Sequence, residues 1–196
     1  MVVPLWSKIA YTLFVCVLVP IYWRFWGPGN FLWFSDVALL VTTVALWLEN
    51  PLLASMMTLA IALPETAWNV DFFGRIATGR QMLGLSGYMF DSNTSRWLRA
   101  LSLFHVVLPV VLLALVVRLG YDRRAWIAQT LFAALWLPLT FALTGPDDNV
   151  NWVYGPGRRP QTVMPRWLYL LLIAILFPLV IYLPVHLLLS RLLGRA

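Results

Sequence analysis

Three apolar stretches of the chain carry side chains that could attack an ester or move a proton. Ser35 and Asp36 stand side by side in the first stretch, Glu65 lies in the second, and His105 lies in the third. A hydroxyl, a carboxylate and an imidazole are the parts of an acyl-transfer centre, in which they act as nucleophile, orienting acid and general base. An acidic side chain inside lipid costs roughly 2.5–3.5 kcal/mol on insertion scales, so it needs a partner or a function. We therefore take these four as the candidate catalytic residues.

The composition of the chain indicates an integral membrane protein. Of its residues, 61% are hydrophobic and only 11% are charged, whereas a soluble domain carries about 25% charged residues. The net charge of +6 is scattered through short loops without a basic run. That pattern suits contacts with anionic lipid headgroups and argues against nucleic acid as a partner. No small-residue cleavage site follows the apolar stretch after Lys8, so we expect a retained helix there.

Segments long enough to cross a membrane recur along the whole chain. A spanning helix needs about 18 or more apolar residues at a rise of about 1.5 Å per residue. The predicted spans cover residues 9–26, 31–49, 51–71, 97–119, 125–144 and 167–193. We therefore predict an all-α fold: one membrane domain over residues 1–196, a bundle of about six transmembrane helices with both termini on the same side.

Acidic side chains gather on one side of this predicted bundle. The loops between spans one and two, three and four, and five and six lie opposite the termini, on what we call the loop side. Most of the acidic residues fall towards it: Asp36, Glu65, Asp71, Asp91, Asp147 and Asp148. Arginines and lysines divide almost evenly between the two sides, so they do not decide the orientation; Lys8 favours cytoplasmic termini. Any chemistry is expected on the loop side.

The candidate catalytic residues lie at matching depths. Asp36, Glu65 and His105 lie about five to eight residues inside the loop-side ends of their spans, which places them near 8–12 Å below the interface. Pro109 follows His105 by four residues and cannot donate a hydrogen bond to its carbonyl, so an unpaired acceptor is expected there. The sequence thus predicts a polar pocket in the bundle, open to the loop side.

Further polar and aromatic residues are expected to line this pocket. Glu65, Trp68 and Asn69 share one face of their helix through the i, i+3, i+4 spacing. The connection 72–96 is apolar and rich in glycine, which predicts an interfacial or re-entrant segment over the bundle. The predicted substrate-binding residues are Asn30, Trp68, Asn69, Asn149, Asn151, Trp152, Arg99 and Arg158. The two arginines are expected to hold a lipid phosphate.

No cofactor or metal is expected. The single cysteine, Cys16, excludes an internal disulfide and a thiolate metal cluster. The two histidines, His105 and His186, lie at opposite depths, which argues against a bis-histidine haem and a histidine-rich metal site.

Several motifs carry a resemblance to known families. They are G-P-G-N-F-L-W-F-S-D (27–36), Y-M-F-D (88–91), L-S-L-F-H-V-V-L-P (101–109), G-Y-D-R-R-A (120–125) and N-V-N-W-V-Y-G (149–155). Over most of its length the chain resembles an uncharacterised family of small bacterial multi-pass membrane proteins. This resemblance implies residence in the bacterial inner (cytoplasmic) membrane.

The order of these motifs is also similar to that in the YwaF-like integral membrane proteins. Their eukaryotic relatives include androgen-induced-type lipid hydrolases and a transmembrane phospholipid acyltransferase. In that group a threonine or cysteine nucleophile on an early helix works with a histidine on a later helix, and an asparagine-glycine-aromatic loop follows. The resemblance implies that Ser35 takes the nucleophile's place, His105 the histidine's, and residues 149–155 the loop. Serine here replaces threonine or cysteine, and the surrounding motif differs.

The sequence therefore predicts a lipid-ester hydrolase or acyltransferase, with Ser35 as nucleophile, His105 as base, and Asp36 or Glu65 as orienting acid. Two other functions fit the same residues. One is a transporter or binding protein for a small solute or a proton, in which the carboxylates and the histidine form a relay. The other is a non-catalytic accessory subunit of a membrane complex, in which the buried charges are paired. The expected partners are membrane lipids and, in the last case, other membrane subunits.

Overall fold

The secondary structure is helical, and none of residues 2–157 and 159–193, which the computed structural model describes, forms a strand. The α-helices are α1 (Leu5–Trp26), α2 (Phe34–Leu48), α3 (Pro51–Thr78), α4 (Arg96–Leu101), α5 (Phe104–Leu119), α6 (Ala125–Leu143), α7 (Arg166–Leu176) and α8 (Leu183–Leu192). The shorter elements are the 3₁₀ turns η1 (Pro28–Leu32), η2 (Gly87–Phe90) and η3 (Val150–Trp152), and a π-helical segment, η4 (Phe177–Tyr182).

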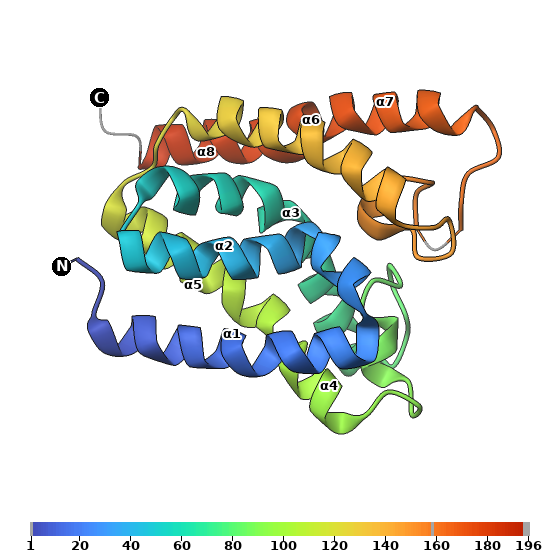
Figure 1. Cartoon of the computed structure of the whole chain (residues 1–196), viewed down its shortest axis with the longest axis horizontal. Helices are drawn as coiled ribbons and strands as arrows, with labels where there is room; N and C mark the ends of the chain where they lie inside the picture. Colours follow the sequence, from blue (N-terminus) through green and yellow to red (C-terminus); the bar gives the residue numbers. More distant parts are fainter. Residues whose placement is uncertain (1, 158, 194–196) are drawn as a thin grey trace.

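These elements combine into six rods. α4 and α5 form one broken rod, Arg96–Leu119, and α7, η4 and α8 form another, Arg166–Leu192; α1, α2, α3 and α6 are the others. The start of α1 and the end of α8 lie at the same end of the molecule (Figure 1). The predicted all-α fold is confirmed.

Four of the rods are long and apolar enough to cross a membrane: Leu5–Trp26, Arg96–Leu119, Ala125–Leu143 and Arg166–Leu192. Large apolar side chains on their outer faces are exposed, such as Leu135 at 76% and Val110 at 66%. Soluble monomers rarely expose continuous apolar surface of this kind. Length and composition therefore identify a multi-pass membrane helical protein. α2, with 15 residues, is shorter than these rods, and α3, with 28 residues, carries more charged side chains.

The segment predicted to be interfacial, 72–96, differs from the structure at its start. α3 continues beyond residue 71 to Thr78 and ends at Gly79, which takes the left-handed conformation at φ +72°. An irregular loop with the η2 turn follows, and α4 then begins at Arg96. The segment is therefore part helix and part loop.

The fourth predicted span, 97–119, is broken rather than continuous. The break lies at Ser102 and Leu103, between α4 and α5. The Ser102 hydroxyl donates to the Leu98 carbonyl one turn earlier at 2.9 Å, a contact that bends helices. The bend gives α4 a direction of its own at the loop side (Figure 1).

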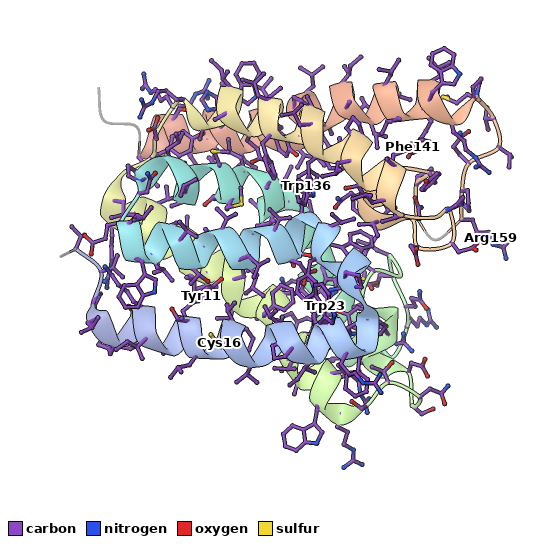
Figure 2. The ribbon with its side chains drawn as sticks, in the orientation of Figure 1. Tyr11, Cys16, Trp23, Trp136, Phe141 and Arg159 are labelled. Carbon is purple, nitrogen blue, oxygen red and sulfur yellow. The ribbon has the colours of Figure 1, made fainter. Side chains whose placement is uncertain are left out.

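α3 is the central helix of the bundle and packs against α2, α5 and α6. The core around it consists of almost fully buried leucines: Leu39, Leu59, Leu108, Leu112 and Leu137. α1 is held to α2 by Tyr11, whose hydroxyl donates to the Leu39 carbonyl at 3.0 Å (Figure 2). Apolar packing along α3 thus fixes the depth of the polar residues on each helix.

An ion pair between α1 and the turn after α2 lies at the terminal side. Lys8 Nζ donates to Glu49 Oε1 at 2.8 Å, and the lysine side chain is only 2% exposed. The backbone N–H groups of Val2 and Val3 donate to the same carboxylate at 2.9 and 3.1 Å. Glu49 therefore ties the first residues of the chain to the α2–α3 turn.

Neutralising Glu49 is expected to loosen this clamp. The hydrogen bond from Lys8, with those from Val2 and Val3, lowers the pKa of Glu49 from 4.5 to about 2. A carboxylate with a lowered pKa stabilises the fold above its ordinary pKa, and this contribution is lost as the pH falls through the lowered value. Glu49→Gln should therefore lower the melting temperature of the detergent-solubilised protein by a few degrees near neutral pH. The difference in melting temperature between Glu49→Gln and the native protein should shrink as the pH falls from 4.5 towards 2.

Asp91→Asn is the matched control, because Asp91 is exposed and its carboxylate accepts from the Asn93 N–H at 2.9 Å. A solvent-facing carboxylate of this kind contributes little, and this variant should melt like the native protein. Equal melting of Glu49→Gln and native protein near neutral pH would show that the clamp does not stabilise the fold.

Candidate functional site

A cavity of about 650 Å³ lies among the loop-side ends of the helices. Its wall comes from the end of α1, η1, the start of α2, the middle of α3, the loop that contains η2, the break between α4 and α5, the segment after α6, and the start of η4. This volume is typical of sites for small molecules. All four candidate catalytic residues line it: Ser35, Asp36, Glu65 and His105.

Glu65 of α3 and His105 of α5 form a direct pair. Both carboxylate oxygens lie 2.9 Å from Nδ1 of the imidazole. The glutamate side chain is 4% exposed and the histidine side chain 14% exposed. When the carboxylate acts as the acceptor in this contact, the proton of the imidazole lies on Nδ1. Trp68 and Phe104 stack on the imidazole with ring centroids at 4.8 and 4.1 Å, which holds the plane of the ring.

The carbonyl of His105 is paired, although Pro109 removes its helical donor. Nδ2 of Asn69 donates to this carbonyl and to the carbonyl of Glu65, both at 2.8 Å. Asn69 was predicted to contact a substrate and lies one turn after Glu65 on α3. Its amide instead joins α3 to α5 at the level of the Glu65–His105 pair, and it is absent from the cavity wall.

Asp36 and Ser35 contact one another rather than the histidine. Nδ2 of Asn30 donates to Oδ1 of Asp36 at 3.2 Å, and the Ser35 hydroxyl lies within interaction range of the same carboxylate. Asp36 is 3% exposed and lies within electrostatic range of His105 and Glu65. Among the described residues no hydrogen bond joins Ser35 to His105. Glu65, not Asp36, is therefore the acid that orients the imidazole.

The loop after α6 fixes the start of α2. Asn151 accepts from the Phe34 N–H at 2.9 Å and donates to the Leu32 carbonyl at 2.8 Å. Trp136 of α6 donates to that carbonyl at 2.9 Å (Figure 2). Asn151 takes φ +51°, a left-handed conformation that asparagine tolerates. Asn151 thus lines the cavity, as a predicted substrate contact should, while its amide positions the helix that carries Ser35.

Asn149 folds the same loop from within. Its Nδ2 donates to the carbonyls of Gly155 and Gly157, both at 2.8 Å, and its Oδ1 accepts from the Tyr154 N–H at 2.8 Å. Asn149 was predicted to bind substrate, but its amide is used inside the loop and it is absent from the cavity wall. Trp152, also predicted, is part of that wall.

Arg99, one of the two predicted arginines, is not part of the wall. Nη1 of Arg99 donates to the Met89 carbonyl at 3.3 Å, which places the arginine against the loop before α4. Arg158 lies outside the described residues. Arg75 covers the Phe90 ring, with its guanidinium carbon 4.3 Å from the centroid. The described loop-side arginines named here therefore contact loop groups rather than the interior of the cavity.

Asp71 holds the loop that follows α3, a role that the sequence did not indicate. Its side chain is fully buried. One oxygen accepts from the N–H groups of Met82, Leu83 and Gly84 at 3.2, 2.6 and 3.0 Å. The other accepts from the N–H and the hydroxyl of Ser86 at 2.8 and 2.7 Å. One carboxylate thus accepts hydrogen bonds from four residues of this loop, and Leu85 of the same loop lines the cavity.

Three further hydroxyl groups line the cavity and were missed in the sequence. Tyr22 of α1 and Ser102 lie 2.6 Å apart, oxygen to oxygen. Tyr88 of η2 also lines the cavity, and burial raises the pKa of its phenol, so it stays a neutral donor. The sequence offered one indication of Ser102 as a wall residue: it precedes His105 by three residues, a spacing that places two side chains on the same helical face.

Comparison with known proteins finds no counterpart, because no protein-family model, no curated protein and no solved structure matches the chain. The function of the cavity must therefore be inferred from its own residues.

Proposed function

We propose that the protein is a membrane-embedded hydrolase or acyltransferase that acts on a lipid-like ester. The observation that carries the proposal is the Glu65–His105 pair at the wall of the cavity. A carboxylate that holds Nδ1 fixes the tautomer and orientation of the imidazole and leaves the other ring nitrogen to accept a proton. This is the arrangement that a general base needs.

In this proposal the nucleophile is the Ser35 hydroxyl, which lines the same cavity. In the resting state His105 is hydrogen-bonded to Glu65 and, among the described residues, not to this hydroxyl, so the hydroxyl must turn to His105 when an ester enters. Hydrogen bonds at catalytic sites often tighten only once the substrate is bound. The imidazole then takes the hydroxyl proton as the serine oxygen attacks the ester carbonyl, and gives it to the alcohol that leaves. The acyl group stays on Ser35 until water, or an acceptor alcohol in acyl transfer, attacks it and restores the serine hydroxyl.

The start of α2 can stabilise the negative charge that develops on the ester oxygen. The backbone N–H groups of Ser35 and Asp36 lie in its first turn and have no acceptor within the described residues. Free N–H groups at a helix start favour an anion, and such donors contribute to acyl transfer. Base, hydroxyl and N–H donors thus surround one cavity.

The membrane setting completes the proposal. All six rods cross the membrane, α2 and α3 included, and the cavity opens on the loop side among lipid headgroups. The resemblance to small bacterial multi-pass proteins and to YwaF-like proteins supports residence in a bacterial inner membrane. The resemblance also supports the role of Ser35 as nucleophile and that of His105 as general base.

One observation favours a proton or solute transporter as a second candidate. Asp36, Glu65 and His105 interact electrostatically within one cavity, as a proton relay requires. Towards the terminal side, however, the neighbouring core is formed by buried leucines such as Leu39 and Leu108. A hydrolase needs access from one side only, so the geometry supports it better.

Labelling with a serine-directed fluorophosphonate tests the hydrolase. The purified full-length protein should be labelled, and Ser35→Ala should lose the label because the nucleophilic oxygen is gone. His105→Ala should lose most of the label because the base is gone. The measurement is in-gel fluorescence of protein reconstituted in lipid.

Ser92→Ala is the matched control, because Ser92 is an exposed serine on the same loop side and lies outside the cavity wall. It should label like the native protein. Undiminished labelling of Ser35→Ala, or no label on any of these proteins, would rule out the serine mechanism.

A further inference from the structure

The described wall of the cavity carries acidic side chains but neither lysine nor arginine. The acids are Asp36, Glu65 and Asp148. Glu65 is paired with His105 at 2.9 Å, and Asp148 accepts weakly from the Gly145 N–H at 3.4 Å. A water-poor space lined by charges of one sign attracts ligands of the opposite sign. An anionic headgroup inside this cavity would therefore be repelled.

Among the described residues, Asp36 forms no ion pair with a lysine, arginine or histidine side chain. The ion pairs among the described residues join Lys8 to Glu49, His105 to Glu65, and Arg124 to Asp122. Within the described part of the chain, the hydrogen-bond donor to Asp36 is the neutral Asn30 amide at 3.2 Å, and the neighbouring Ser35 hydroxyl is also neutral. A buried carboxylate is usually paired with a cation, and here the ligand can supply one.

Aromatic rings line the same cavity as this carboxylate. The tyrosines and tryptophans of the wall are Tyr22, Trp26, Trp33, Trp68, Tyr88 and Trp152. Trp26 and Tyr88 pack edge to face with ring centroids 6.3 Å apart, which joins the end of α1 to η2. Rings of this kind attract cations through their π faces, and quaternary ammonium groups are recognised in this way.

A metal ion is a poor alternative occupant. Within residues 2–157 and 159–193, no group of three or more histidine, cysteine or acidic side chains is placed to hold a metal ion. Aromatic rings do not replace the oxygen ligands that Ca²⁺ and Mg²⁺ require. The chemistry of the wall suits a large, weakly hydrated organic cation.

We propose that the cavity binds substrates through an ammonium group, which pairs with Asp36 and lies against the aromatic rings of the wall. The inference rests on the proposed function, since it names the substrate class of that hydrolase: an ester that carries a primary or quaternary ammonium group. The apolar remainder of such a substrate lies along the aromatic wall, and its ester carbonyl faces Ser35 and His105.

Binding of a non-hydrolysable probe tests this inference apart from any catalysis. Benzyltrimethylammonium and its uncharged carbon analogue neopentylbenzene have the same shape and differ in charge. In calorimetric titrations of the full-length detergent-solubilised protein, the cation should bind about tenfold or more tightly than the analogue. Benzenesulfonate should not compete with it.

Asp36→Asn should weaken binding of the cation about tenfold and leave the neutral analogue nearly unchanged. Asp36→Glu should retain the preference for the cation. Trp26→Leu removes one aromatic face and should also weaken binding of the cation, so the test survives if Asp36→Asn fails to fold. Asp91→Asn is the matched control, because it removes the same charge from an exposed loop-side position outside the wall.

Equal affinity for the cation and the neutral analogue, or an unchanged preference in both Asp36→Asn and Trp26→Leu, would overturn the inference. Fluorophosphonate labelling that depends on Ser35, together with no preference for ammonium, would retain the hydrolase and remove this substrate class. A preference for ammonium without any Ser35-dependent labelling would retain the cation site and remove the hydrolase.

Discussion

Replacing Glu65 by glutamine is expected to lower ester turnover about 10³- to 10⁴-fold, because the imidazole of His105 loses the carboxylate that fixes its proton on Nδ1. Glutamine has nearly the same shape, so the helices can still pack. The rate should be measured with an ammonium ester and with a neutral ester, in lipid, over a range of pH. Both substrates should lose rate by the same factor, since the change affects the base and not the ammonium site.

Histidine NMR gives a readout that does not depend on turnover. The chain has two histidines, so selective ¹⁵N labelling yields two imidazole signals, and His186→Gln assigns them. His105 should show the Nδ1–H tautomer in the native protein and lose this preference in Glu65→Gln. Asp91→Asn should change neither rate nor tautomer. An unchanged tautomer in Glu65→Gln would contradict the orienting role of this carboxylate.

Replacing Asp71 by alanine is expected to release the loop between α3 and η2. The carboxylate accepts hydrogen bonds from the N–H groups of Met82, Leu83, Gly84 and Ser86 and from the Ser86 hydroxyl. Buried donors without acceptors cost about 1–3 kcal/mol each, although water can reach an opened loop. A net loss of about 3 kcal/mol corresponds to opening that is more frequent by about a hundredfold.

Amide hydrogen exchange measures this opening directly. Exchange at residues 82–86 should be faster by about a hundredfold in Asp71→Ala, while amides in the middle of α5 and α6 should keep their protection. In Asp71→Asn the exchange rate at these residues should lie between those of the native protein and Asp71→Ala, because the amide oxygen of asparagine still accepts hydrogen bonds. Asp91→Ala is the control, since Asp91 is exposed and accepts only from the Asn93 N–H. Unchanged exchange at 82–86 in Asp71→Ala would show that the loop holds its shape without this carboxylate.

The depth of the polar residues could be predicted from the sequence. A helix rises about 1.5 Å per residue, so counting from each loop-side end placed Asp36, Glu65 and His105 at one level. The structure places all three on one cavity wall. Almost all the remaining positions of these helices are apolar, so a helix has little freedom to shift along its own axis. Counting residues from the helix end was therefore enough to predict the depth of each polar residue.

The partners of individual polar groups could not be predicted in this way. Spacing along one helix says nothing of its rotation towards a neighbour, and so it did not reveal that Asn69 reaches the His105 carbonyl or that Tyr22 reaches Ser102. The loop held by Asp71 depends on backbone N–H groups, which every residue type supplies. For the same reason the sequence left open whether Asp36 or Glu65 orients the histidine.

The shortness of α2 bears on how the protein sits in lipid. With 15 residues this helix is about 22 Å long, whereas the hydrocarbon core of a bilayer is about 30 Å thick. A span that falls short is accommodated by local thinning of the bilayer. The terminal end of α2 is tied to α1 through Glu49 and Lys8, so the thinning falls at the other end. In the proposed arrangement, headgroups and water would then reach down to the start of α2, which is the level of Ser35.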